Sequence, residues 1–541
     1  MRFLKTPLSL MIAAALTSGM GAHADERDNE SAHEAGIKHV LLISLDGMHA
    51  IDYANCSTGI PTANGGAPYC ANLAALGKHA LNYVQASTSA PSDSFPGLLA
   101  LVTGGSTRST GVFYDVSYDR KLSPPKLNNP VSGLVGGACP GQIGTQVVYD
   151  ESLDNDTSRV DGGNGINPDY LPRDPANACA PVYPHQFLRV NTLFEVVREA
   201  GGYTAWTDKH QAYELVKGPS GNGLNDFYGP EINSTVVGLP GVAGCGTVND
   251  PTATGAWTDS FKNIQCYDKL HLQAILNQID GKTHDGQPAK VPTVFGANFQ
   301  AVSVGQKLHE KSISQTGGYL DALGTPSAGL LNEIQFVDNA IGQMVVALKK
   351  RGLYESTLIV VTAKHGQSAI DPKALLRIPA DNASLKAPSD VLGSLVAGAI
   401  EDDVSMLWLA DQGQTANAVS MLSANPGEFG GGEIYADKSL SLIFNDPAID
   451  SRSPDILVTP TVGVVYTGGT KKVAEHGGFA HDDRNVMLLL ANPQFAPTTI
   501  TSPVQTAQVA PTILKALDLN PHHLKAVKEE HTVILPGMGK F

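Results

Sequence analysis

The clearest hydrophobic run near the N-terminus covers residues 40–45 and ends abruptly at Asp46 and Gly47. Its length and unbroken aliphatic content are typical of a strand buried on both faces, as in the interior of a parallel sheet. Open α/β folds bind their ligands at the carboxyl ends of such strands. The pattern therefore marks Asp46 as a candidate functional residue, and a simple turn-forming role beside Gly47 is the alternative.

Helical and strand patterns alternate along the rest of the chain. Helices are predicted over 69–83 and 191–202, and the best helical periodicity lies at 330–350. A serine-rich turn at 86–96 leads into a further apolar helical segment at 98–102. Buried strands are predicted at 203–207, 291–295, 357–362, 456–466 and 486–490. This alternation predicts an α/β fold with a doubly wound, mostly parallel central sheet and helices on both faces.

Three insertions interrupt the pattern, at about 113–185, 215–285 and 370–450. The first is rich in Gly, Pro, Asn and Asp, as surface loops are. The third contains the acidic run 401–403, which we interpret as a solvated face. The first two are expected to cover the site and set its specificity. The sequence predicts one domain over 25–541 that carries these loop-rich insertions.

Residues 1–24 have the charged, apolar and small-residue order of a secretory signal peptide. Arg2 and Lys5 precede an apolar stretch at 8–16, and the expected cleavage follows Ala24. No later segment has the roughly 18 uninterrupted apolar residues of a membrane-spanning helix. We therefore expect a periplasmic or secreted protein with no membrane span after cleavage.

Six cysteines lie in the first half of the chain, at positions 56, 70, 139, 179, 245 and 266. An exported chain can keep them oxidised, and pairing of sequence neighbours would close three loop-rich segments. Other connectivities, of which there are about 15 in all, and free buried thiols are the alternatives. Zinc binding by cysteine is disfavoured because no two of them have the CxxC spacing.

The net charge of the chain is -15. This balance argues against a nucleic-acid polymer as partner, since a phosphate-binding surface needs clustered Lys and Arg. It allows a small anionic substrate, because a metal ion or a lysine can reverse the field inside one pocket. The composition indicates no oligomeric state.

Polar side chains follow several of the predicted strands. Asp46 follows the first strand, Lys209 and His210 follow the strand at 203–207, and Lys364 with His365 follow the strand at 357–362. His476 precedes a late strand, and Ser94 lies on the serine-rich turn. Aspartate and histidine are suitable zinc ligands, and a hydroxyl beside a metal becomes a nucleophile at neutral pH. Placed together at strand ends, these residues predict a metal-assisted hydrolase.

Several motifs occur in the order found in one known family. They resemble the motifs of the type I phosphodiesterase and nucleotide pyrophosphatase family. The matching parts are the segment Leu42–Gly47, the turn at Ser94–Pro96 with Thr103 and Gly104 behind it, the strand end Leu358–Gly366, and His476 with Gly477. That family belongs to the alkaline phosphatase superfamily. Residues 509–514 of this chain also resemble the C-terminal helix of that superfamily. The similarity covers nearly all of the chain after residue 24.

The resemblance implies a two-zinc site in which a serine or threonine attacks phosphorus. Asp46 and His365 would bind the zinc that activates Ser94, and His476 would bind the other zinc. A covalent phosphoseryl intermediate would then be hydrolysed by metal-bound water.

The chain differs from the family pattern at three places. Lys364 stands where the family has an aspartate, and Gln306 stands roughly where it has a histidine with no carboxylate before it. Gly97 replaces the asparagine that usually follows the Phe-Pro of the nucleophile turn. Lys364 then either points away from the site or replaces a metal by pairing with Asp46 or with a substrate oxygen.

The leading hypothesis is an exported, metal-dependent hydrolase of small phosphate esters, with one or two divalent ions, most simply zinc. Ser94 and Lys364 are its candidate catalytic residues, and Lys209, His210 and Gln306 its candidate substrate contacts. The alternative is a non-catalytic or single-metal member that acts as a binding protein, with Lys364 in place of a metal-ligating carboxylate. Sulfatase-type chemistry lacks the Ser/Cys-x-Pro-x-Arg context around Ser94.

Overall fold

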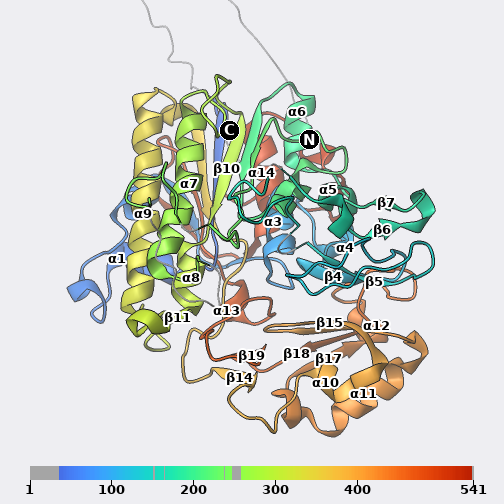
Figure 1. Ribbon diagram of the computed structural model, residues 1–541. Helices are drawn as coiled ribbons and strands as arrows, with labels where there is room; N and C mark the ends of the chain where they lie inside the picture. Colours follow the sequence, from blue (N-terminus) through green and yellow to red (C-terminus); the bar gives the residue numbers. More distant parts are fainter. Residues whose placement is uncertain (1–35, 150–152, 164, 237, 247–256, 539–541) are drawn as a thin grey trace, which may run out of the picture. The chain divides into compact units, whose positions relative to one another are not determined.

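The structure is a computed structural model that describes residues 36–149, 153–163, 165–236, 238–246 and 257–538 (Figure 1). The predicted signal peptide lies outside the described residues. Within those ranges no helix is long and apolar enough to cross a membrane.

Strand β1 (His39–Leu45) lies inside the largest sheet because its side chains are apolar on both faces. It pairs in parallel with β10 (Val294–Phe299) on one edge and with β13 (Thr357–Thr362) on the other. The strand order is β21-β2-β20-β13-β1-β10-β8-β9. The other strands of this sheet are β2 (Ala80–Tyr83), β8 (Thr204–Thr207), β9 (Asp226–Tyr228), β20 (Leu488–Ala491) and β21 (Thr498–Ile500).

Five neighbouring strands, β13, β1, β10, β8 and β9, run parallel, whereas β20 is antiparallel to both β13 and β2. The predicted mostly parallel α/β sheet is therefore confirmed. Because successive side chains of a strand point to opposite faces, β1 contributes Leu41 and Ile43 to one core and Val40 and Leu42 to the other.

Helices cover both faces of this sheet, as predicted. The core with Ile43 is shared with α7 (Phe261–Ile279) and α9 (Ala328–Lys350), which lie side by side in Figure 1. The core with Leu42 is shared with α3 (Ser94–Thr103), α6 (Leu193–Glu199) and α14 (Val509–Ala516). The carboxyl ends of the parallel strands are left for the site.

Three predicted elements differ from the structure. The strand predicted over 456–466 is two short strands, β18 (Ile456–Thr459) and β19 (Val464–Thr467), and neither belongs to the large sheet. The segment predicted as one helix over 69–83 is α2 (Ala71–Gly77) followed by strand β2, because Leu81 and Tyr83 alternate toward the core of the sheet. The region 215–285 is not wholly a surface excursion, since α7 occupies 19 of its residues and packs on the sheet. Its apolar positions, among them Ile264 and Ile275, recur at helical spacing between polar residues.

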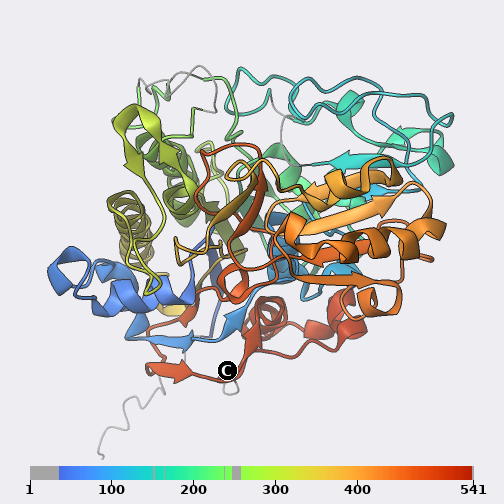
Figure 2. The same ribbon diagram turned by 90° about the horizontal axis from the view of Figure 1, so that it is seen from below.

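The predicted insertion at 370–450 belongs to a second, antiparallel sheet with the order β15-β16-β18-β17, drawn in orange in Figure 1 and Figure 2. Its strands are β15 (Val396–Glu401), β16 (Ser405–Leu409), β17 (Glu433–Ala436) and β18 (Ile456–Thr459). The acidic run 401–403 comprises the last residue of β15 and the first two residues of the turn to β16. The interpretation of this run as a solvated face is wrong, because Asp403 is only 5% exposed.

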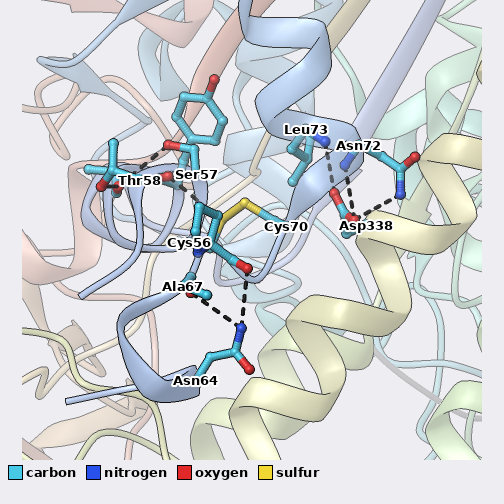
Figure 3. Close-up of a disulfide and its surroundings, with 12 residues drawn as sticks. Cys56, Ser57, Thr58, Asn64, Ala67, Cys70, Asn72, Leu73 and Asp338 are labelled. Atoms are coloured by element: carbon cyan, nitrogen blue, oxygen red, sulfur yellow. Dashed lines mark hydrogen bonds between the residues drawn. A yellow bond between two sulfur atoms is a disulfide. The ribbon is translucent and has the colours of Figure 1, made fainter. Parts of the chain in front are cut away.

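Three disulfides join sequence neighbours, Cys56–Cys70, Cys139–Cys179 and Cys245–Cys266, so the predicted pairing is confirmed. Figure 3 shows Cys56–Cys70, which ties α1 (Ala50–Thr58) to the start of α2. Beside it, the carboxylate of Asp338 on α9 accepts hydrogen bonds from the backbone N–H groups of Asn72 (3.1 Å) and Leu73 (2.8 Å). A negative charge at a helix N-terminus fixes α2 on α9.

Candidate active site

Four neighbouring parallel strands end at the same edge of the sheet and supply the site. Asp46 follows β1, Asp208 and Lys209 follow β8, and Lys364 with His365 follow β13. The end of β10 and the residue after it contribute the amides of Asn298 and Gln300. Because the sheet register is fixed on both sides of β1, these side chains meet although they are far apart in the sequence.

Asp46 lies at the centre of the site and is fully buried. Its Oδ2 atom accepts hydrogen bonds from the side-chain amides of Asn298 (3.1 Å) and Gln300 (2.6 Å). The same oxygen lies 3.6 Å from Lys364 Nζ and 3.6 Å from His365 Nε2. Burial alone would raise the pKa of the Asp46 carboxyl, but the charges of Lys364 and His365 outweigh burial and hold this pKa well below its usual value.

Lys364 points into the site and is fully buried. Its Nζ donates a hydrogen bond to Asp208 Oδ1 at 3.1 Å and lies 4.3 Å from the centre of the Tyr213 ring, a cation–π contact. Asp208 is in turn held by the indole N–H of Trp206 (3.1 Å). Of the two orientations that the sequence left open, the structure has the one in which Lys364 pairs with Asp46, and it adds Asp208 as a second partner.

Ser94 is the first residue of helix α3, and Asp93 caps that helix by accepting a hydrogen bond from the Phe95 N–H (3.1 Å). The Oγ atom of Ser94 accepts a hydrogen bond from Lys209 Nζ at 3.1 Å. A hydroxyl at the start of a helix, beside an ammonium group, is a suitable place for an oxygen nucleophile because both the cation and the helix dipole favour negative charge there.

Two histidines lie next to each other in the site. The ring centroids of His365 and His476 are 3.9 Å apart. His365 Nδ1 donates to the Gly366 carbonyl (2.9 Å), which leaves Nε2 as the unprotonated nitrogen of a neutral ring. Burial lowers the pKa of both imidazoles, and that of His476 is lowered further by the charge of His365. Both rings are therefore neutral at pH 7.

His476 also faces the helix cap, since its Nδ1 lies 3.6 Å from Asp93 Oδ1. Burial, together with the charge of Asp115, raises the pKa of Asp93 well above its usual value. Asp93 and Asp115 are residues that the sequence analysis did not single out as functional. Asp93 stands directly before Ser94, and that adjacency was the available signal.

The other predicted substrate contacts, His210 and Gln306, are paired with internal partners. His210 Nδ1 pairs with Glu231 (2.8 Å), and its ring stacks on Tyr213. Gln306 donates to the Gly47 carbonyl (2.7 Å) and to the Tyr319 hydroxyl (2.8 Å), so its amide is used in an internal network behind the turn. The structure thus brings together Asp46, Ser94, Lys209, Lys364, His365 and His476, and it leaves out Gln306 and the imidazole of His210.

The residues at the site do not fit a two-zinc centre. Lys364 replaces a carboxylate, and its ammonium group is already 3.6 Å from Asp46. At ~4 Å two unit charges interact by about 4 kcal/mol at an effective dielectric near 20, and a dication doubles this repulsion. Among the described residues, no group of three or more His, Cys, Asp or Glu side chains could hold a metal ion.

The parallel sheet, with a serine and charged groups at its carboxyl edge, defines an alkaline phosphatase-like α/β protein. The family model of "Type I phosphodiesterase / nucleotide pyrophosphatase" matches residues 40–213 and 273–482. The chain therefore belongs to this family of phosphoric ester hydrolases, which acts on small phosphate esters and is generally metal-dependent. No curated protein matches the chain.

Solved structures show the same fold at low sequence identity. Murine ectonucleotide pyrophosphatase / phosphodiesterase 5, in an inactive form in complex with AMP, has a TM-score of 0.54 and 13% identity, covering 90% of this chain and 96% of that chain. The murine protein in another structure has a TM-score of 0.53 at 13% identity, with 89% and 96% covered. The human protein has a TM-score of 0.51 at 13% identity, with 89% and 95% covered.

Proposed function

We propose that this chain is an exported hydrolase of small phosphate esters in which Ser94 is the nucleophile. The observation that carries the proposal is the contact between Ser94 Oγ and Lys209 Nζ, 3.1 Å, at the start of α3. The resemblance of the Ser94–Pro96 turn to the nucleophile turn of the family supports this role, and a cation beside the hydroxyl stabilises the oxygen as its proton leaves.

The reaction runs in two displacements at phosphorus. Ser94 Oγ forms a bond to phosphorus, the bond from phosphorus to the leaving alcohol breaks, and the serine proton passes through a neutral imidazole to the departing oxygen. Water then attacks the phosphoserine, which releases phosphate or a phosphomonoester and restores the hydroxyl. His365 Nε2 suits the proton transfer because it is the unprotonated nitrogen of a neutral ring.

Lys209 holds Ser94 and offers its charge to the transferring phosphoryl group. Lys364 acts indirectly. It is fully buried and holds the carboxylates of Asp46 and Asp208 in place. Export is supported by the N-terminal pattern of residues 1–24 and by three disulfides, which form and persist outside the cytosol.

The test is an assay of the exported, disulfide-intact protein on aryl phosphate monoesters and diesters. Ser94→Ala is expected to lower kcat by at least ~10³-fold, since it removes the covalent pathway. Ser94→Thr keeps a hydroxyl and is the matched control. If Ser94→Ala hydrolyses these esters as fast as the wild type, the nucleophile assignment fails.

A second candidate function is a non-catalytic binding protein. It is favoured by one observation, the complete burial of Lys364 between Asp46 and Asp208, which neutralises the central carboxylate. In that case the wild type and Ser94→Ala both lack ester hydrolysis, while an aryl phosphate still raises the unfolding temperature of both.

A further inference from the structure

We infer that the ammonium groups of Lys364 and Lys209 replace divalent metal ions in this chain, so that its site is complete without a bound metal. The inference deepens the proposed function and concerns the same residues. It can fail separately from that function, because metal content is measured whether or not the protein hydrolyses esters.

The first step is the position of Lys364. Its Nζ lies between two carboxylates, 3.1 Å from Asp208 and 3.6 Å from Asp46, with the ring of Tyr213 against it. A cation between two buried carboxylates is what a metal ion supplies at a carboxylate-lined site. Because Lys364 is fully buried, an incoming ion would have to displace an ammonium group that is shielded from solvent and already paired.

The second step is the chemistry of the neighbouring amides. Asn298 and Gln300 each direct an N–H donor at Asp46 Oδ2. A carboxylate oxygen that accepts two N–H bonds and faces an ammonium group has its lone pairs engaged, whereas a metal ligand must offer a lone pair. Gln306, which the sequence places near a family ligand position, is bonded to Gly47 and Tyr319 instead.

The third step is the position of the second cation, Lys209. Lys209 places its charge at the nucleophile, 3.1 Å from Ser94 Oγ, where an activating metal would otherwise act.

The strongest counter-observation is a set of four buried atoms near the centre of the site. Asp46 Oδ1, His365 Nε2, His476 Nδ1 and Asp93 Oδ1 make no hydrogen bond within the described structure. Catalytic zinc sites use three protein ligands and a water, however, and no three such side chains of the described residues are arranged to hold one ion. The position next to His365, where the family has an aspartate that could serve as a third ligand, is occupied by Lys364.

The experiment measures zinc per chain. Wild type, purified without a histidine tag, is incubated with zinc chloride, passed over a desalting column and analysed by mass spectrometry of the metal, alongside Asp46→Asn. The zinc content of the wild type is expected to exceed that of Asp46→Asn by less than ~0.1 ion per chain. Zinc that Asp46→Asn retains equally lies elsewhere and agrees with the inference. About one zinc or more in the wild type that Asp46→Asn lacks overturns it.

A gain-of-binding variant makes the test two-sided. Lys364→Asp restores a carboxylate beside His365 and is expected to bind ~1 zinc per chain with a rise in unfolding temperature on adding zinc. Lys364→Gln removes the same ammonium without adding a ligand and is expected to bind none. A folded Lys364→Asp variant that binds no more zinc than the wild type contradicts the inference. If Lys364→Asp does not fold, the comparison of the wild type with Asp46→Asn decides.

Discussion

The carbonyl oxygen of Lys364 lies so close to Gly97 that a Cβ atom at position 97 would stand 2.0 Å from it. This contact sets the first turn of α3, and with it Ser94, against the strand end that carries Lys364 and His365. The asparagine that the family has after its Phe-Pro pair cannot occupy this backbone position without moving the helix. Gly97 is therefore part of how this site is assembled.

Gly97→Ala is expected to destabilise the protein and to lower ester hydrolysis. Overpacking at such a contact costs about 1–3 kcal/mol, which opposes a helix-propensity gain of at most about 1 kcal/mol. Urea unfolding gives the free energy. Gly427→Ala, at a position with no heavy atom within 4 Å of the added Cβ, is the control and should change it by less than ~0.5 kcal/mol. Equal stability of the two variants would show that α3 can shift freely.

Lys209→Met is expected to lower kcat/KM by about 10²–10³-fold, as the loss of one charged donor at a reaction centre does. Lys209→Arg keeps a donor and should recover part of this loss. Lys217→Met is the control, because Lys217 lies farther along the same segment and pairs with Glu214 (3.5 Å). Kinetics on an aryl phosphate compare the three, and a similar loss in the Lys209 and Lys217 variants would remove Lys209 from the site.

Lys364→Met is expected to cost about 3–5 kcal/mol, since it leaves two buried carboxylates without their shared cation. Asp208→Asn in the same chain should recover part of the loss, so a double-mutant cycle gives a coupling energy above ~1 kcal/mol. Lys126→Met is the control. It breaks the ion pair between Lys126 and Asp169, and because the Lys126 side chain is 66% exposed, the loss of stability should be less than ~1 kcal/mol. Additive effects of the Lys364 and Asp208 changes would contradict the pairing.

Glu333 predicts a pH dependence of stability away from the site. It is fully buried on α9, accepts one hydrogen bond from Gln265 (3.2 Å), and burial raises its pKa to about 9. The stability this raised pKa confers is complete below the usual value of 4.5 and is lost as pH rises toward 9. Glu333→Gln should therefore match the wild type near pH 4.5 and exceed it increasingly at higher pH, by up to ~1.4 kcal/mol per pH unit.

Unfolding temperatures at several pH values check this. Glu199→Gln, at an exposed position of α6, should show no such pH-dependent difference. A Glu333→Gln variant that differs from the wild type equally at all pH values would mean that Glu333 is ionised in the fold.

The strands of the sheet were predicted from the sequence because an unbroken aliphatic run such as 40–45 is typical of a strand that is buried on both faces. The sequence predicted Asp46 and His365 at one edge for the same reason, since parallel strands end together, whereas Ser94 was predicted from the motif of its turn. It missed α7 because polar residues and Cys266 interrupt the apolar positions, and the helical period appears only when these are placed on one face.

Contacts between distant segments were the part that the sequence left open. The direction of Lys364 depends on Asp208 and Tyr213, which lie more than 150 positions earlier in the chain. The same holds for Gln306, whose amide is directed by Gly47 and Tyr319, and for Asp403, which is buried and accepts a hydrogen bond from Ser368 (2.9 Å).

The ion pair between Lys364 and Asp208 joins the ends of β13 and β8, with β1 and β10 between them. No partial fold that lacks either side of β1 can form it, so the reaction centre arises only when both halves of the chain have docked. Hydrogen exchange at the ends of β8 and β13 should consequently report the same opening free energy, that of the whole sheet, and a nascent or truncated chain carries Ser94 without its completed surroundings.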